Sequence, residues 1–217
     1  MEEENYILRT VEGYNKLASL YFKYCHSHTS QEIKNLKKFY DYLFEKKIVI
    51  DIGCGTGKDG KFLKDNYGVE TIGIDLSEEM LKISKKYLPH IIKADMRYLP
   101  LRSCIADGII SNSSLVHLKK EDKIKTCKEV YRVLKKYGIF YVVIQNKYNI
   151  RYFLRQLKFI IKNRKLILGY SDYDYRNWYY ESYWSFKEIL SYLHFRILSS
   201  TKNPFARFLI FYSIKEI

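Results

Sequence analysis

The stretch IVIDIGCGTGKDG, residues 48–60, spells G-x-G-x-x-G with Gly55, Gly57 and Gly60. In a dinucleotide-binding fold, the first glycine of this pattern follows directly from a buried strand, because the turn and the next helix must meet the pyrophosphate there. The glycine in that place is Gly53, and a pattern counted from Gly53 has Lys58 as its third member. The literal match therefore begins inside the turn, which argues against a dinucleotide.

The acid just before the turn gives a second reason. Asp51 lies near the end of the strand-like run 47–52, where its carboxylate would repel the charges of a diphosphate. A ligand that carries an ammonium and a sulfonium reverses the sign, and S-adenosylmethionine is such a ligand. Asp75, which ends the run 70–75, has two oxygens suited to a ribose diol. Dinucleotide enzymes place an acid there too, so Asp75 does not separate the two ligands.

Strand-like and helix-like segments alternate through the middle of the chain, which predicts a parallel sheet wrapped by helices. Two helices are expected first, at 13–25 and 31–46, with Thr29 and Glu32 at capping-box spacing. Strands are expected at 47–52, 70–75, 90–94, 107–111 and 138–144. Helices are expected between them at 58–66, 77–87 and 121–135.

The last third departs from this alternation. We expect a long helix at 149–168, an aromatic stretch at 169–184, a helix capped by Ser185 and Glu188 that runs to Leu193, and strands at 195–200 and 207–214. The fold class is α/β: a Rossmann-like three-layer sandwich with a seven-stranded, mostly parallel sheet and helices on both faces. We expect one domain, with a helical cap at 1–46, a cofactor-binding core at 47–146, a lid insertion at 147–184 and a C-terminal part at 185–217.

Bulk composition agrees with one such domain. The chain has 217 residues, of which 47% are apolar, and its uninterrupted apolar runs are far shorter than the roughly 20 residues that cross a bilayer. The acidic start MEEENYILRT does not resemble a secretory signal, so we expect a cytoplasmic protein. The group Cys25-His26-Ser27-His28 offers metal ligands, but the sequence has no second Cys or His cluster to complete a four-ligand site, so we expect no metal.

The formal net charge is +14, from 38 Lys and Arg against 24 Asp and Glu. Such an excess favours anionic partners, among them nucleic acid, a lipid surface or an acidic small molecule. A bias of the genome toward AT-rich codons is the competing explanation, because Lys, Ile, Asn and Tyr are all abundant. Charge alone therefore leaves the partner open.

Four blocks in order resemble the class I S-adenosylmethionine-dependent methyltransferases, in particular the branch with the small type-11 domain. They are VIDIGCGTGK (49–58), GIDLSEEML (73–81), KADMRYLPLRSCIADGIISNSSLVHL (93–118) and EVYRVLKKYGIFYVVI (129–144). With the lead-in YNKLASLY, the resemblance spans about residues 14–144. In this lead-in Asn15 stands where the family usually has Asp, which weakens the match there.

The resemblance implies S-adenosylmethionine as the cofactor and a set of residues that contact it. Asp51 and the backbone of Gly53, Cys54, Gly55 and Gly57 would hold the methionine end, and Asp75 would take the ribose. Leu76 would flank the adenine, and Asp95 with Met96 would meet its amino group. Ser111 would line the methionine side through its backbone, and Tyr14 would cover the cofactor.

Methyl transfer from a sulfonium needs mainly proximity and in-line alignment, and a base only where the acceptor must lose a proton. The best candidate base is His117, in SNSSLVHL after the fourth strand, where open parallel sheets bind ligands. A structural role is the competing interpretation. Tyr179, Tyr180 and Tyr183 are looser candidates.

The acceptor must be inferred from the atypical segment. Arg151, Arg155, Lys158 and Lys162 form one stripe of the expected helix, which could bind RNA phosphates, lie on anionic lipid or face water as part of a lid. The aromatic stretch could stack on a base or enclose an amine, and Arg176 followed by aromatics loosely resembles the tRNA wobble-uridine methyltransferases. We expect a small-molecule acceptor, with tRNA or another structured RNA next. A nicotinamide dehydrogenase and a non-catalytic S-adenosylmethionine-binding protein are the alternatives from other classes.

Overall fold

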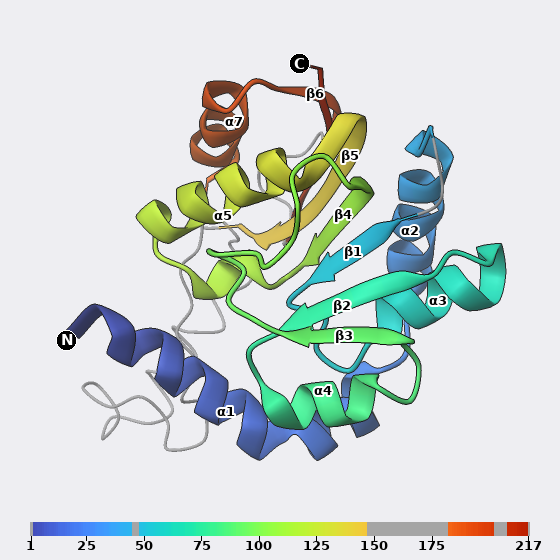
Figure 1. The fold of residues 1–217 in the computed structure, drawn as a ribbon, viewed down its shortest axis with the longest axis vertical. Coiled ribbons are helices and arrows are strands. Elements are labelled where there is room, and N and C mark those ends of the chain that lie inside the picture. Colours follow the sequence, from blue (N-terminus) through green and yellow to red (C-terminus); the bar gives the residue numbers. More distant parts are fainter. Residues whose placement is uncertain (1, 45–47, 147–181, 202–207, 217) are drawn as a thin grey trace, which may run out of the picture.

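The computed structural model describes residues 2–44, 48–146, 182–201 and 208–216. Its helices are α1 (Glu2–Cys25), α2 (Ser30–Tyr42), α3 (Lys58–Tyr67), α4 (Glu78–Ser84), α5 (Lys120–Val133) and α7 (Tyr183–Tyr192), with a short 3-10 turn η1 (Leu115–His117) (Figure 1). Its strands are β1 (Val49–Ile52), β2 (Thr71–Asp75), β3 (His90–Lys93), β4 (Ala106–Asn112), β5 (Leu134–Gln145), β6 (Phe195–Ser200) and β7 (Phe208–Lys215).

The strands form one seven-stranded sheet in the order β3-β2-β1-β4-β5-β7-β6. Strands β1 to β5 pair in parallel, whereas β7 runs antiparallel between β5 and β6. The predicted Rossmann-like, seven-stranded and mostly parallel sheet is therefore confirmed. Strand order reverses at β1, because β2 and β4 flank it on opposite sides. In open parallel sheets this reversal opens a crevice at the carboxyl ends of the strands.

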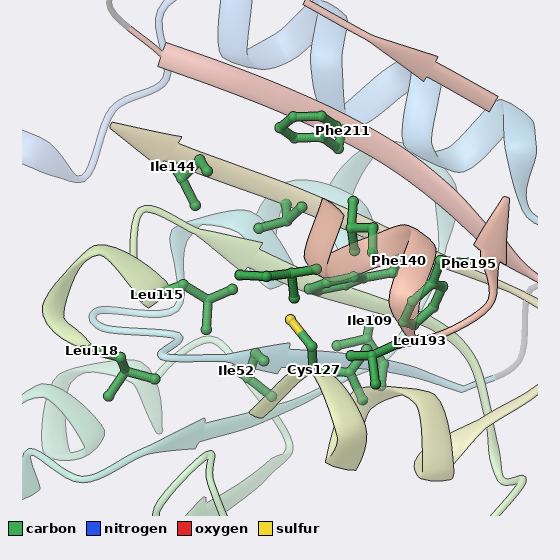
Figure 2. Packing of buried hydrophobic residues seen from close by; sticks show 14 of the residues in the cluster. Ile52, Ile109, Leu115, Leu118, Cys127, Phe140, Ile144, Leu193, Phe195 and Phe211 are labelled. Carbon is green, nitrogen blue, oxygen red and sulfur yellow. The ribbon is translucent and has the colours of Figure 1, made fainter. Parts of the chain in front are cut away.

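Two hydrophobic layers cover the two faces of the sheet. On β5, Phe140, Val142 and Ile144 pack in the layer of α5 and α7, and the alternate residues Ile139, Tyr141 and Val143 pack in the layer of α2 and α3. Figure 2 shows part of the first layer, with Cys127 of α5 beneath the strands and Leu193 and Phe195 beside α7. This alternation is the two-residue period of a strand buried on both faces.

Several element boundaries differ from the predicted ones, including those of α1, β5 and α7. The first helix begins at Glu2 rather than near residue 13, and β5 begins at Leu134 rather than at residue 138. The cap predicted at Ser185 is wrong, because Ser182 is the N-cap of α7 and its side chain accepts the backbone N–H of Ser185. The earlier start lets Tyr183 stack on Phe211 of β7. The capping box of Thr29 and Glu32 is confirmed.

The long helix predicted at 149–168 and the aromatic stretch up to residue 181 lie outside the described residues. The same holds for the basic stripe and for the greater part of the expected lid insertion. These predictions stay predictions.

Candidate functional site

The glycine turn between β1 and α3 is left-handed at three positions. Gly53, Gly55 and Gly57 have φ angles of 70°, 53° and 78°, values that side-chain-bearing residues rarely adopt. At Gly53 a Cβ atom would also lie 2.3 Å from Cβ of Ser114, so glycine is required there on two counts. The N–H groups of Gly53 and Cys54 donate to the carbonyl of Ile74, which ties the turn to the end of β2.

Two adjoining hollows open at this edge of the sheet and share Tyr21, Gly53, Gly55, Asn112 and Ser113. The one that we call the turn hollow is lined by Asp51, the glycine turn and Asp59. The other, which we call the α1 hollow, has a wall from α1, including Ile7, Val11 and Tyr14, and its volume is about 800 Å³ when the space open to solvent is included. Together they form one cleft over the carboxyl ends of β1, β2 and β4, large enough for a cofactor-sized ligand.

Asp51 is the most unusual group in the turn hollow. Asp51 is only 2% exposed, and among the described residues no group donates a hydrogen bond to its carboxylate. Burial raises the pKa of the Asp51 carboxyl well above its ordinary value, and the negative charges of Asp59 and Asp75 add to that rise. A carboxylate in this state is stabilised by a cation.

Asp75 is held by two backbone amides at the end of β2. Gly55 donates to Oδ2 at 2.9 Å and Ser77 to Oδ1 at 2.8 Å. Burial raises the pKa of the Asp75 carboxyl, whereas these hydrogen bonds work in the opposite direction. Each carboxylate oxygen keeps a second lone pair, so the fixed group can accept two further donors from the α1 hollow, which it lines.

Leu76, Asp95 and Met96 also line the α1 hollow, on the side of β2 and β3. The Asp95 carboxylate accepts hydrogen bonds from Nε and from a terminal nitrogen of Arg97, the second at 2.7 Å. Arg97 in turn reaches Asp122 in the first turn of α5, at 3.3 Å. Arg97 therefore fixes the orientation of Asp95 from outside the hollow.

Tyr14 and His117 meet in the α1 hollow, although 103 residues separate them in the sequence. The Tyr14 hydroxyl lies 2.7 Å from Nε2 of His117, and the two rings are edge to face at 5.2 Å. His117 is 8% exposed. The pair is thus a partly buried, hydrogen-bonded unit that lines the cleft and has the geometry to relay a proton.

Residues 49–138 match the family model described as a methyltransferase domain. This region is therefore similar to a methyltransferase domain, and it makes up less than half of the chain. The glycine turn, Asp51 and Asp75 all lie inside the matched region. His117 and strands β1 to β4 also lie inside it, whereas most of β5 and all of β6 and β7 lie outside it.

Known relatives support this class of domain. An uncharacterized protein of Methanocaldococcus jannaschii is 32% identical over 148 residues, 67% of this chain and 55% of that protein. The probable tRNA methyltransferase 9B of Mus musculus is 34% identical over 134 residues, 60% of this chain and 29% of that protein. The chain thus spans little more than half of the first relative and under a third of the second.

A solved structure from Thermotoga maritima shows the same fold. It is described as a SAM-dependent methyltransferase, possible histamine N-methyltransferase. Its TM-score is 0.68 at 20% identity, over 95% of this chain and 100% of that chain.

Some predicted residues of the methyltransferase domain lie elsewhere. Ser111 lines neither hollow: it is fully buried, and its hydroxyl lies 2.7 Å from that of Ser114. The next residues, 112–114, face the cleft instead, because β4 continues to Asn112. Tyr183 also lies away from the cleft, with its hydroxyl 2.9 Å from that of Ser200 on β6. Tyr179 and Tyr180 lie outside the described residues.

Cys54 lines the turn hollow, its side chain packs with Leu81 and Leu88, and burial raises the pKa of its thiol well above the ordinary value. Reactive cysteines have lowered pKa values, so this thiol packs rather than reacts. Asn15 replaces the family's Asp without losing the local contact, because its side-chain oxygen accepts the Ser77 hydroxyl at 2.7 Å. That bond fastens α1 to the start of α4.

The group Cys25-His26-Ser27-His28 has a role that its sequence did not indicate. The ring of His26 lies 3.0 Å from the hydroxyl of Thr56, and Nε2 of His28 lies 2.7 Å from Oδ1 of Asp59. Both histidines thus hold the loop between α1 and α2 against the glycine turn. Among the described residues, no set of His, Cys, Asp and Glu side chains is arranged to hold a metal ion.

A search of the same residues for helices that could span a membrane finds none with sufficient length and apolar character.

Proposed function

We propose that the protein transfers a methyl group from S-adenosylmethionine to an acceptor bound in the α1 hollow. One observation carries the proposal: a chain of net charge +14 buries the carboxylate of Asp51 beside its glycine turn, with no hydrogen-bond donor to it among the described residues. A diphosphate would be repelled there, whereas an ammonium or sulfonium would be attracted. The dehydrogenase alternative is therefore disfavoured.

In this proposal the cofactor spans both hollows. Asp51 and the backbone of residues 53–57 bind its methionine end in the turn hollow. Asp75 accepts the ribose hydroxyls, and Leu76, Asp95 and Met96 surround the adenine in the α1 hollow. The bound cofactor supplies an activated methyl group with a neutral leaving group.

The remaining chemistry belongs to His117 and Tyr14. His117 accepts the proton of an acceptor hydroxyl or ammonium, directly or through the Tyr14 hydroxyl that lies 2.7 Å from Nε2. The wall of α1 excludes water and aligns the acceptor, which supplies most of the acceleration in a displacement of this kind.

A small-molecule acceptor is the first candidate, because the surroundings of Tyr14 and His117 are compact and apolar, with Ile7, Val11 and Leu118. A structured RNA is the second candidate. It is favoured by the net charge of +14 and by the likeness to a probable tRNA methyltransferase.

The test uses S-adenosylmethionine labelled in its methyl group. The protein and this cofactor are incubated with bulk tRNA in one reaction and with a metabolite extract in another. We expect label in the metabolite fraction; label in tRNA alone would establish the second candidate. The matched variants are Asp51→Asn and Asp65→Asn, of which the second removes an exposed carboxylate from α3. Equal transfer by Asp51→Asn and the wild type would contradict the site, and failure of the wild type to bind the cofactor would contradict the function.

A further inference from the structure

The strand period places Asp51 on a particular face of the sheet. Its neighbours Ile50 and Ile52 pack in the layer of α5 and α7, and Val49 packs in the layer of α2 and α3. Because successive side chains alternate, Asp51 shares the face of Val49 and is directed toward the first turn of α3. Asp59, the second residue of that helix, lines the same hollow.

The carboxylate of Asp59 is fixed from two other elements. Oδ1 lies 2.7 Å from Nε2 of His28 in the loop between α1 and α2, and Oδ2 accepts the side-chain amide of Asn112 at the end of β4 at 2.8 Å. Asp59 is 3% exposed. Each of its oxygens keeps a second lone pair, so a rigidly held group can still accept a donor from the hollow.

Two buried carboxylates at one hollow repel each other unless a cation lies between them. After burial, the negative charge of Asp59 contributes most to the raised pKa of Asp51. Lys58, a described cation that lines this hollow, offsets part of this repulsion, but its Nζ lies 2.7 Å from Glu32 and is paired there. Asp51 has no donor among the described residues, and the pair is therefore complementary to a ligand cation.

We propose that Asp59 is a second cofactor-binding carboxylate, which together with Asp51 binds the α-ammonium group of the cofactor's amino-acid end. His28 and Asn112 are positioning residues that orient Asp59. The inference rests on the proposed function and extends it to a residue that no motif of the resemblance contains.

The two carboxylates can bind the ammonium from two sides, since one belongs to the sheet and the other to a helix. An ammonium has three donors, which suits two acceptors from the protein. Charge-assisted hydrogen bonds of this kind are about twice as strong as neutral ones. The two carboxylates would therefore favour a ligand that carries the amino-acid end over an adenosyl thioether that lacks it.

The experiment compares two ligands by titration calorimetry. S-adenosylhomocysteine has the amino-acid end, and 5′-methylthioadenosine has the same adenosyl thioether without it. The variants are Asp59→Asn and the control Asp65→Asn, which makes the same charge change on the same helix at a side chain that is 52% exposed. We expect Asp59→Asn to weaken S-adenosylhomocysteine about tenfold or more and to leave methylthioadenosine unchanged. Asp65→Asn should change neither ligand.

The proposal is overturned if Asp59→Asn keeps the wild-type ratio of the two affinities, or if both ligands weaken equally. A wild type that binds neither ligand would instead defeat the proposed function. A second measurement needs no variant: the deaminated analogue of S-adenosylhomocysteine keeps the carboxylate and lacks the ammonium. It should bind the wild type about tenfold more weakly than S-adenosylhomocysteine, and equal binding would also overturn the proposal.

Discussion

The turn hollow and the α1 hollow adjoin each other, yet the chain builds them in different ways. The turn hollow consists of strand ends and a glycine turn, fixed by the backbone hydrogen bonds from Gly53 and Cys54 to Ile74. The α1 hollow is closed by a helix that is fastened through side chains, such as Asn15 on Ser77 and Tyr6 on Asp122. The turn hollow is therefore rigid and lined by charged groups, whereas the shape of the α1 hollow depends on a few side-chain contacts of α1.

The contrast also separates binding from chemistry. The carboxylates proposed to bind the ammonium line the turn hollow, whereas His117, the proposed proton acceptor, and Tyr14 line the α1 hollow. Substitution of the carboxylates in the turn hollow should therefore affect cofactor affinity, and substitution of His117 should affect turnover. The predictions below test this division.

The largest effect is expected from His117→Ala. If His117 accepts the acceptor's proton, kcat for methyl transfer should fall about 10²- to 10⁴-fold, the usual contribution of a general base. Cofactor affinity should change little, because the residues proposed to bind the cofactor in both hollows are intact. Single-turnover transfer of labelled methyl and calorimetric titration measure the two quantities separately. If kcat is unchanged for the acceptor that the labelling experiment identifies, His117 has a structural role.

The glycine turn allows a matched pair of substitutions. Gly53 and Gly68 have nearly the same φ angles, 70° and 68°, but only Gly53 has a neighbour that a Cβ would overlap. Gly68→Ala should cost about 1 kcal/mol of unfolding free energy, the strain of the left-handed backbone. Gly53→Ala should cost about 3 kcal/mol, because overpacking adds to the same strain.

Urea denaturation of both variants measures this difference. Gly68→Ala should still bind S-adenosylhomocysteine, since Gly68 ends α3 away from the cleft. Equal costs at the two glycines would mean that Ser114 moves aside freely.

The carboxyl of Asp51 should make cofactor binding depend on pH. Its pKa is raised in the ligand-free fold, and a bound ammonium lowers it again, so binding releases a proton. Affinity should rise as pH increases from the ordinary Asp range through the raised pKa, and Asp51→Asn should bind about tenfold more weakly with a flat pH profile. Calorimetry in two buffers of different ionisation enthalpy detects the released proton.

The same group has the opposite effect on stability. A raised carboxyl pKa means that the folded state binds the proton more tightly, so stability is lost as pH rises through the raised value. Ligand-free Asp51→Asn should therefore be more stable than the wild type at neutral pH, with the difference vanishing at acid pH. A variant that is less stable at neutral pH would show that Asp51 has a partner in solution.

The parts of the site that the sequence predicts are those with local signals. Gly53, Asp51 and Asp75 follow or end predicted strands, and a left-handed turn leaves few residue types to choose from. The seven strands were predictable for the same reason, because buried strands show their period in consecutive residues. The position of Asp95 followed from the resemblance.

The parts that escaped prediction depend on contacts between distant segments. His28 meets Asp59 only because the loop after α1 folds over α3, and nothing in the letters Cys-His-Ser-His indicates a carboxylate partner. Ser111 was misplaced by a single residue, since the end of β4 decides which of residues 111–114 face the cleft. The partnership of Tyr14 and His117 spans 103 residues and has no local signal.

The smallest effect is expected at the outer fastening of the α1 hollow. Tyr6 donates its hydroxyl to Asp122 at the start of α5, and burial together with Asp122 raises the pKa of Tyr6, so the hydroxyl stays protonated. Tyr6→Phe should cost about 1 kcal/mol, the net value of one hydrogen bond, and speed amide exchange in the first turns of α1. The control Tyr24→Phe alters a ring that is 71% exposed and should do neither.

S-adenosylhomocysteine and methylthioadenosine distinguish the effect of this helix wall from the effect of the turn hollow. Because α1 contacts the adenosyl side of the cleft, Tyr6→Phe should weaken S-adenosylhomocysteine and methylthioadenosine by the same small factor. Asp59→Asn should weaken only the first. If Tyr6→Phe changed the ratio of the two affinities, the hollows would be coupled through α1, and the loop with His28 that follows this helix would be the connection.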